Sequence, residues 1–103
     1  MVGKGVRDVE QDIIGKLKTL KPGLQELFGI TELAVFGSYA RGEDKNDSDI
    51  DIVILKMERK NGLIIARAKR YLSEQLGREI DIGLYDSLRP FIRKRIEREL
   101  IRV

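Results

Sequence analysis

Two aspartates separated by one residue follow a Gly-Ser pair, and these four residues could carry out chemistry. Gly37 and Ser38 precede Asp49 by ten intervening residues, and Ile50 separates Asp49 from Asp51. Glycine permits a sharp turn whose free backbone N–H groups can bind a phosphate, and the Ser38 hydroxyl adds one more donor. Paired carboxylates supply the oxygen ligands that Mg²⁺ or Mn²⁺ prefers. The sequence therefore predicts a site in which metal ions bridge the protein to a nucleoside triphosphate.

A third carboxylate, Asp81, occurs on a later stretch with the same alternation as the Asp49–Asp51 segment. Residues 49–55 and 79–84 alternate isoleucine or leucine with acidic or small residues, which indicates two strands with one buried face. If these strands are neighbours, all three aspartates share the opposite face. Side chains two apart on a strand are about 6–7 Å apart, so the carboxylates should repel and some of their pKa values should rise. One or two divalent cations would remove that repulsion.

The segments that must position these residues are short and alternate between helical and strand patterns. In order, we expect a helix after Asp8, a break at Pro22-Gly23, a short helix ending near Gly29, a strand over 32–36, one helical turn after Gly37, a loop over 42–48, a strand over 49–55, a helix from Asn61 to Gly77, a strand over 79–84 and a helix opened by Asp86-Ser87. This order predicts an α/β (α+β) fold in which helices cover one face of a small mixed sheet of about three strands.

The composition limits the kinds of chemistry that the chain can perform. Its 103 residues predict one domain over residues 1–103. The lack of histidine excludes serine–histidine and cysteine–histidine catalysis and histidine-rich zinc sites. The lack of cysteine, of a membrane-length apolar run and of a secretory signal favours a cytoplasmic protein. A net charge of +3 is weak evidence for nucleic-acid binding.

The Gly-Ser pair, ten intervening residues and Asp-Ile-Asp together resemble the signature of the DNA polymerase β-like nucleotidyltransferases. The longer string FGSYARGEDKNDSDIDIVI is similar to the minimal nucleotidyltransferases of prokaryotes, and the resemblance continues to RPFIRKRIERELI near the end of the chain. These short proteins are often encoded beside a HEPN-domain protein as a toxin–antitoxin pair. The resemblance implies the nucleotidyltransferase fold, which is similar to the palm of polymerase β.

The resemblance also implies a role for each residue that matches the signature. Gly37 and Ser38 would bind the β- and γ-phosphates of ATP, and Asp49 and Asp51 would hold two Mg²⁺ or Mn²⁺ ions. Asp81 matches the third carboxylate, which would hold the catalytic metal and help to deprotonate the acceptor hydroxyl.

The resemblance extends to two further residues of the nucleotide site. Arg41 occurs where such proteins often carry arginine, and it would either contact a phosphate or brace the loop. Ser48 would orient Asp49. Two other acidic residues lie near Asp81: Asp86 is better explained as a turn or cap residue, and Glu79 lies one pleat earlier on the same face.

The activity implied by the resemblance is transfer of AMP from ATP to a hydroxyl, with release of pyrophosphate. The chain covers a nucleotide half-site and little else, so the acceptor would come from another molecule. The resemblance points to a tyrosine of a HEPN toxin partner, which makes this chain an antitoxin that acts by AMPylation. Two alternatives stay open: a non-catalytic antitoxin that masks a toxin, and a nucleotidyltransferase that acts on RNA.

The C-terminal segment is basic and has an apolar stripe at helical spacing, formed by Ile92, Ile96, Leu100 and Val103. A solvated amphipathic helix explains these charges, and a docking surface for an acidic partner or for RNA is the alternative. The three phenylalanines are predicted to be core residues: Phe28, Phe36 and Phe91. Without an aromatic platform for stacked bases, RNA binding is the less favoured alternative.

Overall fold

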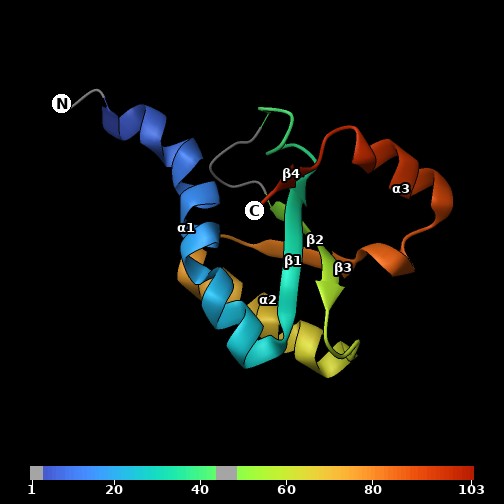
Figure 1. Ribbon diagram of the computed structural model, residues 1–103. Coiled ribbons are helices and arrows are strands. Elements are labelled where there is room, and N and C mark those ends of the chain that lie inside the picture. Colours follow the sequence, from blue (N-terminus) through green and yellow to red (C-terminus); the bar gives the residue numbers. More distant parts are fainter. Residues whose placement is uncertain (1–3, 44–48) are drawn as a thin grey trace.

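A four-stranded mixed sheet forms the centre of the computed structural model, which describes residues 4–43 and 49–103, with side chains from Ile13 onward (Figure 1). The strands are β1 (Ile30–Phe36), β2 (Ile50–Met57), β3 (Ile80–Leu84) and β4 (Ile101–Arg102), in the spatial order β3-β2-β1-β4. β1 pairs antiparallel with β2 and β4, and β2 pairs parallel with β3. The strand predictions over 32–36, 49–55 and 79–84 are confirmed, with boundaries shifted by one or two residues.

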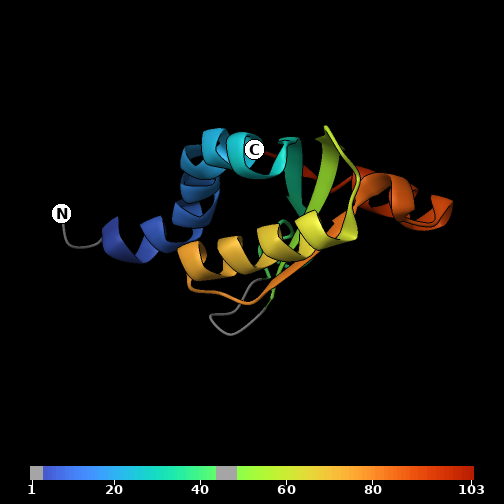
Figure 2. The same cartoon turned by 90° about the horizontal axis from the view of Figure 1, so that it is seen from below.

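The helices divide between the two faces of the sheet (Figures 1 and 2). α1 (Lys4–Phe28) and α2 (Gly62–Leu76) pack on the face that carries Leu33, Val35 and the isoleucines of β2. α3 (Pro90–Glu97) packs through Ile96 on the other face, against Ala34 and Val53. The expectation that all helices cover one face is therefore wrong for α3.

The break predicted at Pro22-Gly23 is also wrong, because α1 is one helix that continues through Pro22. A proline inside a helix removes one hydrogen bond and costs about 3 kcal/mol or more. Leu17 and Leu24, on either side of the proline, are both fully buried in the main core. Their burial offsets the cost of the proline and keeps both parts of the helix on the sheet.

The α2 helix begins and ends where the sequence predicts. The Asn61 side chain accepts hydrogen bonds from the backbone N–H groups of Leu63 and Ile64, at 2.8 and 3.2 Å. Gly77 closes the helix in the left-handed conformation, with φ of 66°. Both signals are local in sequence, because the capping residue and the groups that it caps lie within one turn of each other.

The C-terminal segment differs from its prediction at both ends. Its helix begins at Pro90 rather than at Asp86-Ser87, which lie in the short 3-10 turn η1 (Tyr85–Ser87). Proline fits the first helical position because its fixed φ suits a helix and its missing N–H would have no partner there. The helix ends at Glu97, and Ile101 and Arg102 form β4 instead of a further helical turn.

β4 forms because the edge of β1 offers free backbone groups for pairing. Val35 and Ala34 of β1 pair with Ile101 and Arg102. Phe91 also departs from prediction, since 65% of it is exposed and it does not belong to the core. None of the helices in the described ranges is long and apolar enough to cross a membrane.

Candidate nucleotide site

The Gly-Ser pair lies in a tight turn at the end of β1. Gly37 has a φ of 76°, a conformation that favours glycine. The backbone N–H of Arg41 donates to the carbonyl of Gly37 at 3.1 Å, so the following residues form the expected single helical turn. Ser38 is half-buried within this turn, and Tyr39 anchors it by inserting into the main core.

Gly37 packs directly against the carboxylate of Asp51. A Cβ atom added at Gly37 would overlap the Asp51 carboxylate and lie 3.0 Å from its Cγ. The two residues meet because β1 and β2 are antiparallel, which sets Phe36 opposite Asp51. The tertiary structure thus brings the first and last residues of the sequence signature into contact, and no other residue type than glycine fits at position 37 without displacing the carboxylate.

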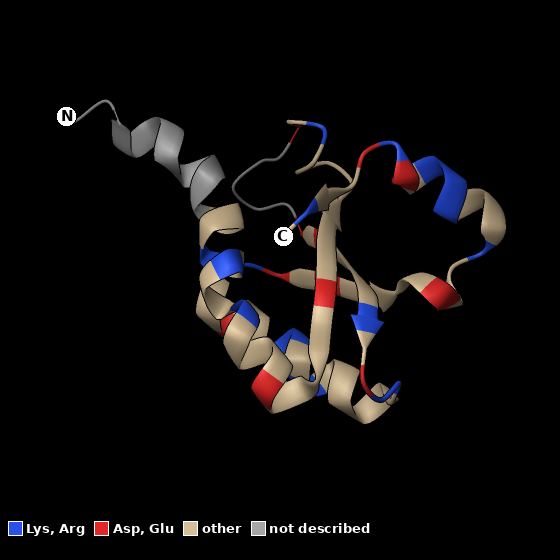
Figure 3. Cartoon of the chain, in the orientation of Figure 1, with Lys and Arg blue, Asp and Glu red and all other residues tan. Residues whose placement is uncertain are grey.

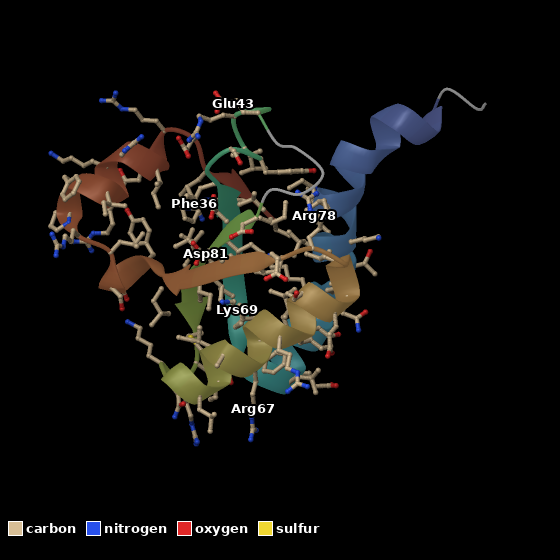
Figure 4. The ribbon with its side chains drawn as sticks, turned by 180° about the vertical axis from the view of Figure 1, so that it is seen from behind. Phe36, Glu43, Arg67, Lys69, Arg78 and Asp81 are labelled. Atoms are coloured by element: carbon tan, nitrogen blue, oxygen red, sulfur yellow. The ribbon has the colours of Figure 1, made fainter. Side chains whose placement is uncertain are left out.

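Two of the three predicted carboxylates are direct neighbours across strands. Asp51 pairs in register with Asp81 in the parallel ladder of β2 and β3, and Figure 4 shows Asp81 on the β3 ribbon. Asp49 lies immediately before β2 and is exposed. The expectation that the two strands are neighbours and carry Asp51 and Asp81 on one face is confirmed. Ser48 lies outside the described residues.

The pKa of Asp51 is raised above its ordinary value. Partial burial is the main cause, and the negative charges of Asp81 and then Asp49 add to it. Arg41 acts in the opposite direction with a smaller effect. The site therefore holds more negative charge at Asp51 than its own cations offset, as the sequence pattern predicts.

A pocket of about 360 Å³ opens beside this carboxylate. One wall is the Gly-Ser turn, and the opposite wall comes from α3 and the residues after it. Its lining residues are Phe36, Gly37, Ser38, Arg41, Asp51, Ile92, Arg95, Ile96 and Glu99. A backbone turn, a cation and a carboxylate on one concave surface form a site suited to a charged ligand.

The sequence interpretation missed Glu99, whose carboxylate accepts hydrogen bonds from both Gly37 and Arg41 in this pocket. Its Oε2 accepts a hydrogen bond from the backbone N–H of Gly37 at 2.7 Å and another from Arg41 Nη1 at 3.2 Å. Arg41 Nε also donates to Glu43 at 3.1 Å. The Arg41 guanidinium thus links the turn to the C-terminal segment through Glu99, and this contact agrees with the loop-bracing role predicted for Arg41. No sequence signal marks Glu99, because it is one of several acids in a charged segment.

The donors at this site fit a divalent cation in type and charge. Asp51 and Asp81 offer carboxylate oxygens in register, and Asp49 immediately precedes β2. The raised pKa of Asp51 reflects its burial together with unbalanced negative charge from its neighbours. Within the described ranges, no three acidic side chains are already gathered closely enough to form a complete metal site.

Comparison with known proteins identifies the family of this site. Residues 17–103 match the family model described as the nucleotidyltransferase domain. Protein adenylyltransferase MntA of Thermococcus cleftensis is 39% identical over 93 residues, which cover 90% of this chain and 94% of that protein.

Two solved structures share the fold. A candidate minimal nucleotidyltransferase is 32% identical, with a TM-score of 0.68 and coverage of 95% of this chain and 92% of the other. A complex of a tri-AMPylated Shewanella oneidensis HEPN toxin with an MNT antitoxin matches at 19% identity. Its TM-score is 0.59, over 93% of this chain and 69% of that chain, which is a likeness of fold.

Proposed function

The chain belongs to the nucleotidyltransferase domain family, among the minimal nucleotidyltransferases of the polymerase β-like superfamily, and from this we propose that it transfers AMP from ATP to a partner protein. It is a nucleotidyltransferase related to the MntA protein adenylyltransferases. The observation that carries the proposal is the contact between Gly37 and the Asp51 carboxylate. That contact joins a turn suited to phosphate with carboxylates suited to a metal ion in one site.

In this proposal, the acceptor hydroxyl oxygen attacks the α-phosphorus of ATP. The bond from that phosphorus to the oxygen that bridges to the β-phosphorus breaks, and pyrophosphate leaves. The Ser38 hydroxyl and the N–H groups of the turn other than that of Gly37, which donates to Glu99, bind the β- and γ-phosphates. Asp49, Asp51 and Asp81 would hold Mg²⁺ or Mn²⁺, which when bound neutralises phosphate charge. Asp81 is also the candidate base for the acceptor proton, because it is exposed at the side of Asp51.

We assign the acceptor to a tyrosine of a HEPN-domain partner encoded with this chain. The fold relative in complex with a tri-AMPylated HEPN toxin supports this choice of partner. An antitoxin that modifies its toxin needs only a nucleotide site and a docking surface. The catalytic effect would come mostly from positioning and from neutralising charge.

The test combines the purified protein, the HEPN-domain protein, Mg²⁺ and ATP labelled at the α-phosphate. We expect label on the HEPN-domain protein. No label should appear when EDTA is present or when Asp81→Asn replaces the wild type. Glu79→Gln is the matched control, because Glu79 is exposed and lies one pleat from Asp81 on the same face. Mass spectrometry of the labelled protein then identifies the modified residue.

The other two functions give different results in the same assay. Label on added RNA would favour the RNA-modifying enzyme, and the exposed Phe91 on a basic helix provides one ring on which a base could stack. Absence of label, together with Mg²⁺-independent binding of the HEPN-domain protein, would favour the non-catalytic antitoxin. Full activity of Asp81→Asn would contradict the role given to Asp81.

A further inference from the structure

Glu99 occupies a backbone donor that the nucleotide signature would otherwise offer to phosphate. Its carboxylate accepts the N–H of Gly37 at 2.7 Å, and only 18% of its side chain is exposed. A phosphate oxygen cannot take the same N–H while the carboxylate remains there. The Gly-Ser turn is therefore divided: Gly37 N–H bonds to Glu99, and Ser38 faces the pocket with Arg41 beside it.

Glu99 is held in this position by its own backbone. Its N–H donates to the carbonyl of Ile96 at 2.9 Å, which closes the end of α3. Two residues later, Ile101 pairs with Val35 of β1, so the chain is fixed on both sides of Glu99. A side chain fixed in this way acts as part of the framework of the site.

We propose that Glu99 is a positioning residue for nucleotide binding, which holds the Gly-Ser turn through Gly37 N–H and orients Arg41. This inference rests on the proposed nucleotide site. Without the carboxylate, Gly37 N–H and the Arg41 guanidinium lose a shared partner, and among the described residues Arg41 keeps its exposed contact with Glu43. The turn then has to be ordered when ATP binds, which weakens binding.

The opposite hypothesis is that Glu99 is a competitor that ATP must displace. The two hypotheses predict opposite signs for the effect of removing the carboxylate. A competitor that is removed leaves a tighter site, whereas a support that is removed leaves a weaker one.

The test measures two properties in wild type, Glu99→Ala, Glu99→Gln and Glu43→Gln. The first is the Kd for ATP with Mg²⁺ by calorimetry. The second is the hydrogen-exchange rate of the Gly37 amide by NMR without nucleotide. Glu43→Gln is the matched control, because Glu43 also pairs with Arg41 but is exposed and makes no contact with Gly37 N–H. The second measurement needs neither ATP nor an acceptor, so it stands even if the proposed function fails.

We expect Glu99→Ala to raise the Kd about tenfold and to speed exchange of the Gly37 amide, since a charged hydrogen bond is lost. Glu99→Gln keeps an acceptor for that amide and should recover most of both properties. Glu43→Gln should change the Kd by less than about twofold. Tighter ATP binding in Glu99→Ala, or an unchanged hydrogen-exchange rate of its Gly37 amide, would overturn the proposal.

A separate observation concerns the outer face of α3. Phe91, Lys94 and Arg95 of α3 and the capping residue Arg98, which follows it in the helical conformation, recur at helical spacing, so they lie on one side, and all four are exposed. Figure 3 shows basic residues along α3. Glu97, the acidic residue of this helix, accepts a hydrogen bond from the Tyr85 hydroxyl. We call the four exposed residues the α3 outer face.

The α3 outer face continues into the candidate nucleotide site, because Arg95 also lines the pocket beside Gly37 and Asp51. An exposed aromatic ring among cations fits a partner that offers carboxylates around an apolar contact. Single-stranded RNA normally uses several stacking rings, and this face has one. We infer that the α3 outer face docks an acidic protein segment that carries the acceptor hydroxyl, an inference that rests on the proposed function.

The probe for this surface is a fluorescent copolymer of glutamate and tyrosine, compared with an oligouridylate. Binding is measured without ATP at low and high salt, so failure of catalysis does not affect the result. The test variant is Phe91→Ala with Lys94→Glu and Arg98→Glu. The matched control is Leu63→Ala with Arg67→Glu and Arg70→Glu, which makes the same charge change beside an exposed apolar residue of α2. Thermal unfolding checks that both variants fold.

We expect the α3 variant to weaken copolymer binding about tenfold and the α2 variant to weaken it by less than about twofold. Equal losses in both variants would overturn the proposal, because they would reflect net charge alone. If the α3 variant binds the copolymer as well as wild type but no longer binds the oligouridylate, the proposal is also overturned, and RNA becomes the ligand of this face.

Discussion

The two faces of strand β2 perform different tasks. On one face, Ile50, Ile52 and Ile54 are fully buried in the main core under α1 and α2. On the other, Asp51 is half-buried beside the candidate nucleotide pocket, and Val53 and Leu55 pack in a small apolar cluster with α3. Alternation along a single strand thus separates stability from the candidate site. Substitutions on the two faces should therefore have separable effects.

The largest effect is expected from Asp51→Asn on AMP transfer. Loss of the central carboxylate should lower the rate about 10³-fold or more, equivalent to about 4 kcal/mol in the barrier. The protein should stay folded, because Asp51 lies outside the main core. The measurement is the initial rate of labelling, with thermal unfolding as the control. Transfer at the wild-type rate would remove Asp51 from the site.

On the other face, Ile52→Ala tests the stability half of the comparison. Ile52 is fully buried, so removing its side chain beyond Cβ should lower the free energy of unfolding by about 2–5 kcal/mol. Chemical denaturation measures this loss. The fraction that remains folded should transfer AMP at a nearly normal rate. A loss below about 0.5 kcal/mol would mean that this face is not the main core.

Gly37→Ala should lower both stability and AMP transfer, because Gly37 contacts the Asp51 carboxylate. An alanine at this position would have an unfavourable φ, and its Cβ would overlap the Asp51 carboxylate. We therefore expect AMP transfer to fall about a hundredfold. Gly42→Ala is the matched control, since Gly42 has the same φ of 76° but nothing within 4 Å of an added Cβ. If both variants lose the same activity, backbone strain explains the effect, and the contact with Asp51 does not.

A smaller effect is expected at the start of α2, on the core side of the sheet. Asn61→Ala removes the acceptor for two backbone N–H groups and should lower the free energy of unfolding by about 1 kcal/mol. Asn61→Asp keeps the cap and should lose much less. Transfer of AMP should be unchanged in both. A change in activity as large as that in stability would contradict the separation of the two faces.

The smallest effect concerns the stability of Asp51→Asn. The pKa of Asp51 is raised in the folded protein, so its ionisation at neutral pH lowers stability. The amide in the variant carries no charge, and the variant should melt slightly higher than wild type at neutral pH, without metal. The difference should shrink as the pH falls through the pKa of Asp51, because the wild-type carboxyl is then protonated. A variant that melts lower than wild type at every pH would contradict this sign.

Several features of the fold and site could be predicted because their signals are local. The alternation of Asp51 with isoleucines defined a strand and its two faces, and Asn61 and Gly77 marked the ends of α2. The Gly-Ser pair predicted the turn at the end of β1. In each case the residues that interact lie within a few positions of one another, so spacing alone carries the information.

Other features depended on partners far away in the sequence. Pro22 does not interrupt α1, because the core holds Leu17 and Leu24 on both sides of it. Phe91 has helical spacing with its neighbours, but spacing does not say whether anything covers it, and it is exposed.

Residue types and their spacing were enough to establish the family signature, the alternating strands and the acidic character of the site. Long-range packing was needed to show that Gly37 touches Asp51, that β4 adds to the free edge of β1, and that Glu99 bonds to Gly37 N–H across 62 positions of the chain. The physical reason is that hydrogen bonds and contacts between distant residues depend on how strands pair and helices pack. That arrangement is a property of the whole chain.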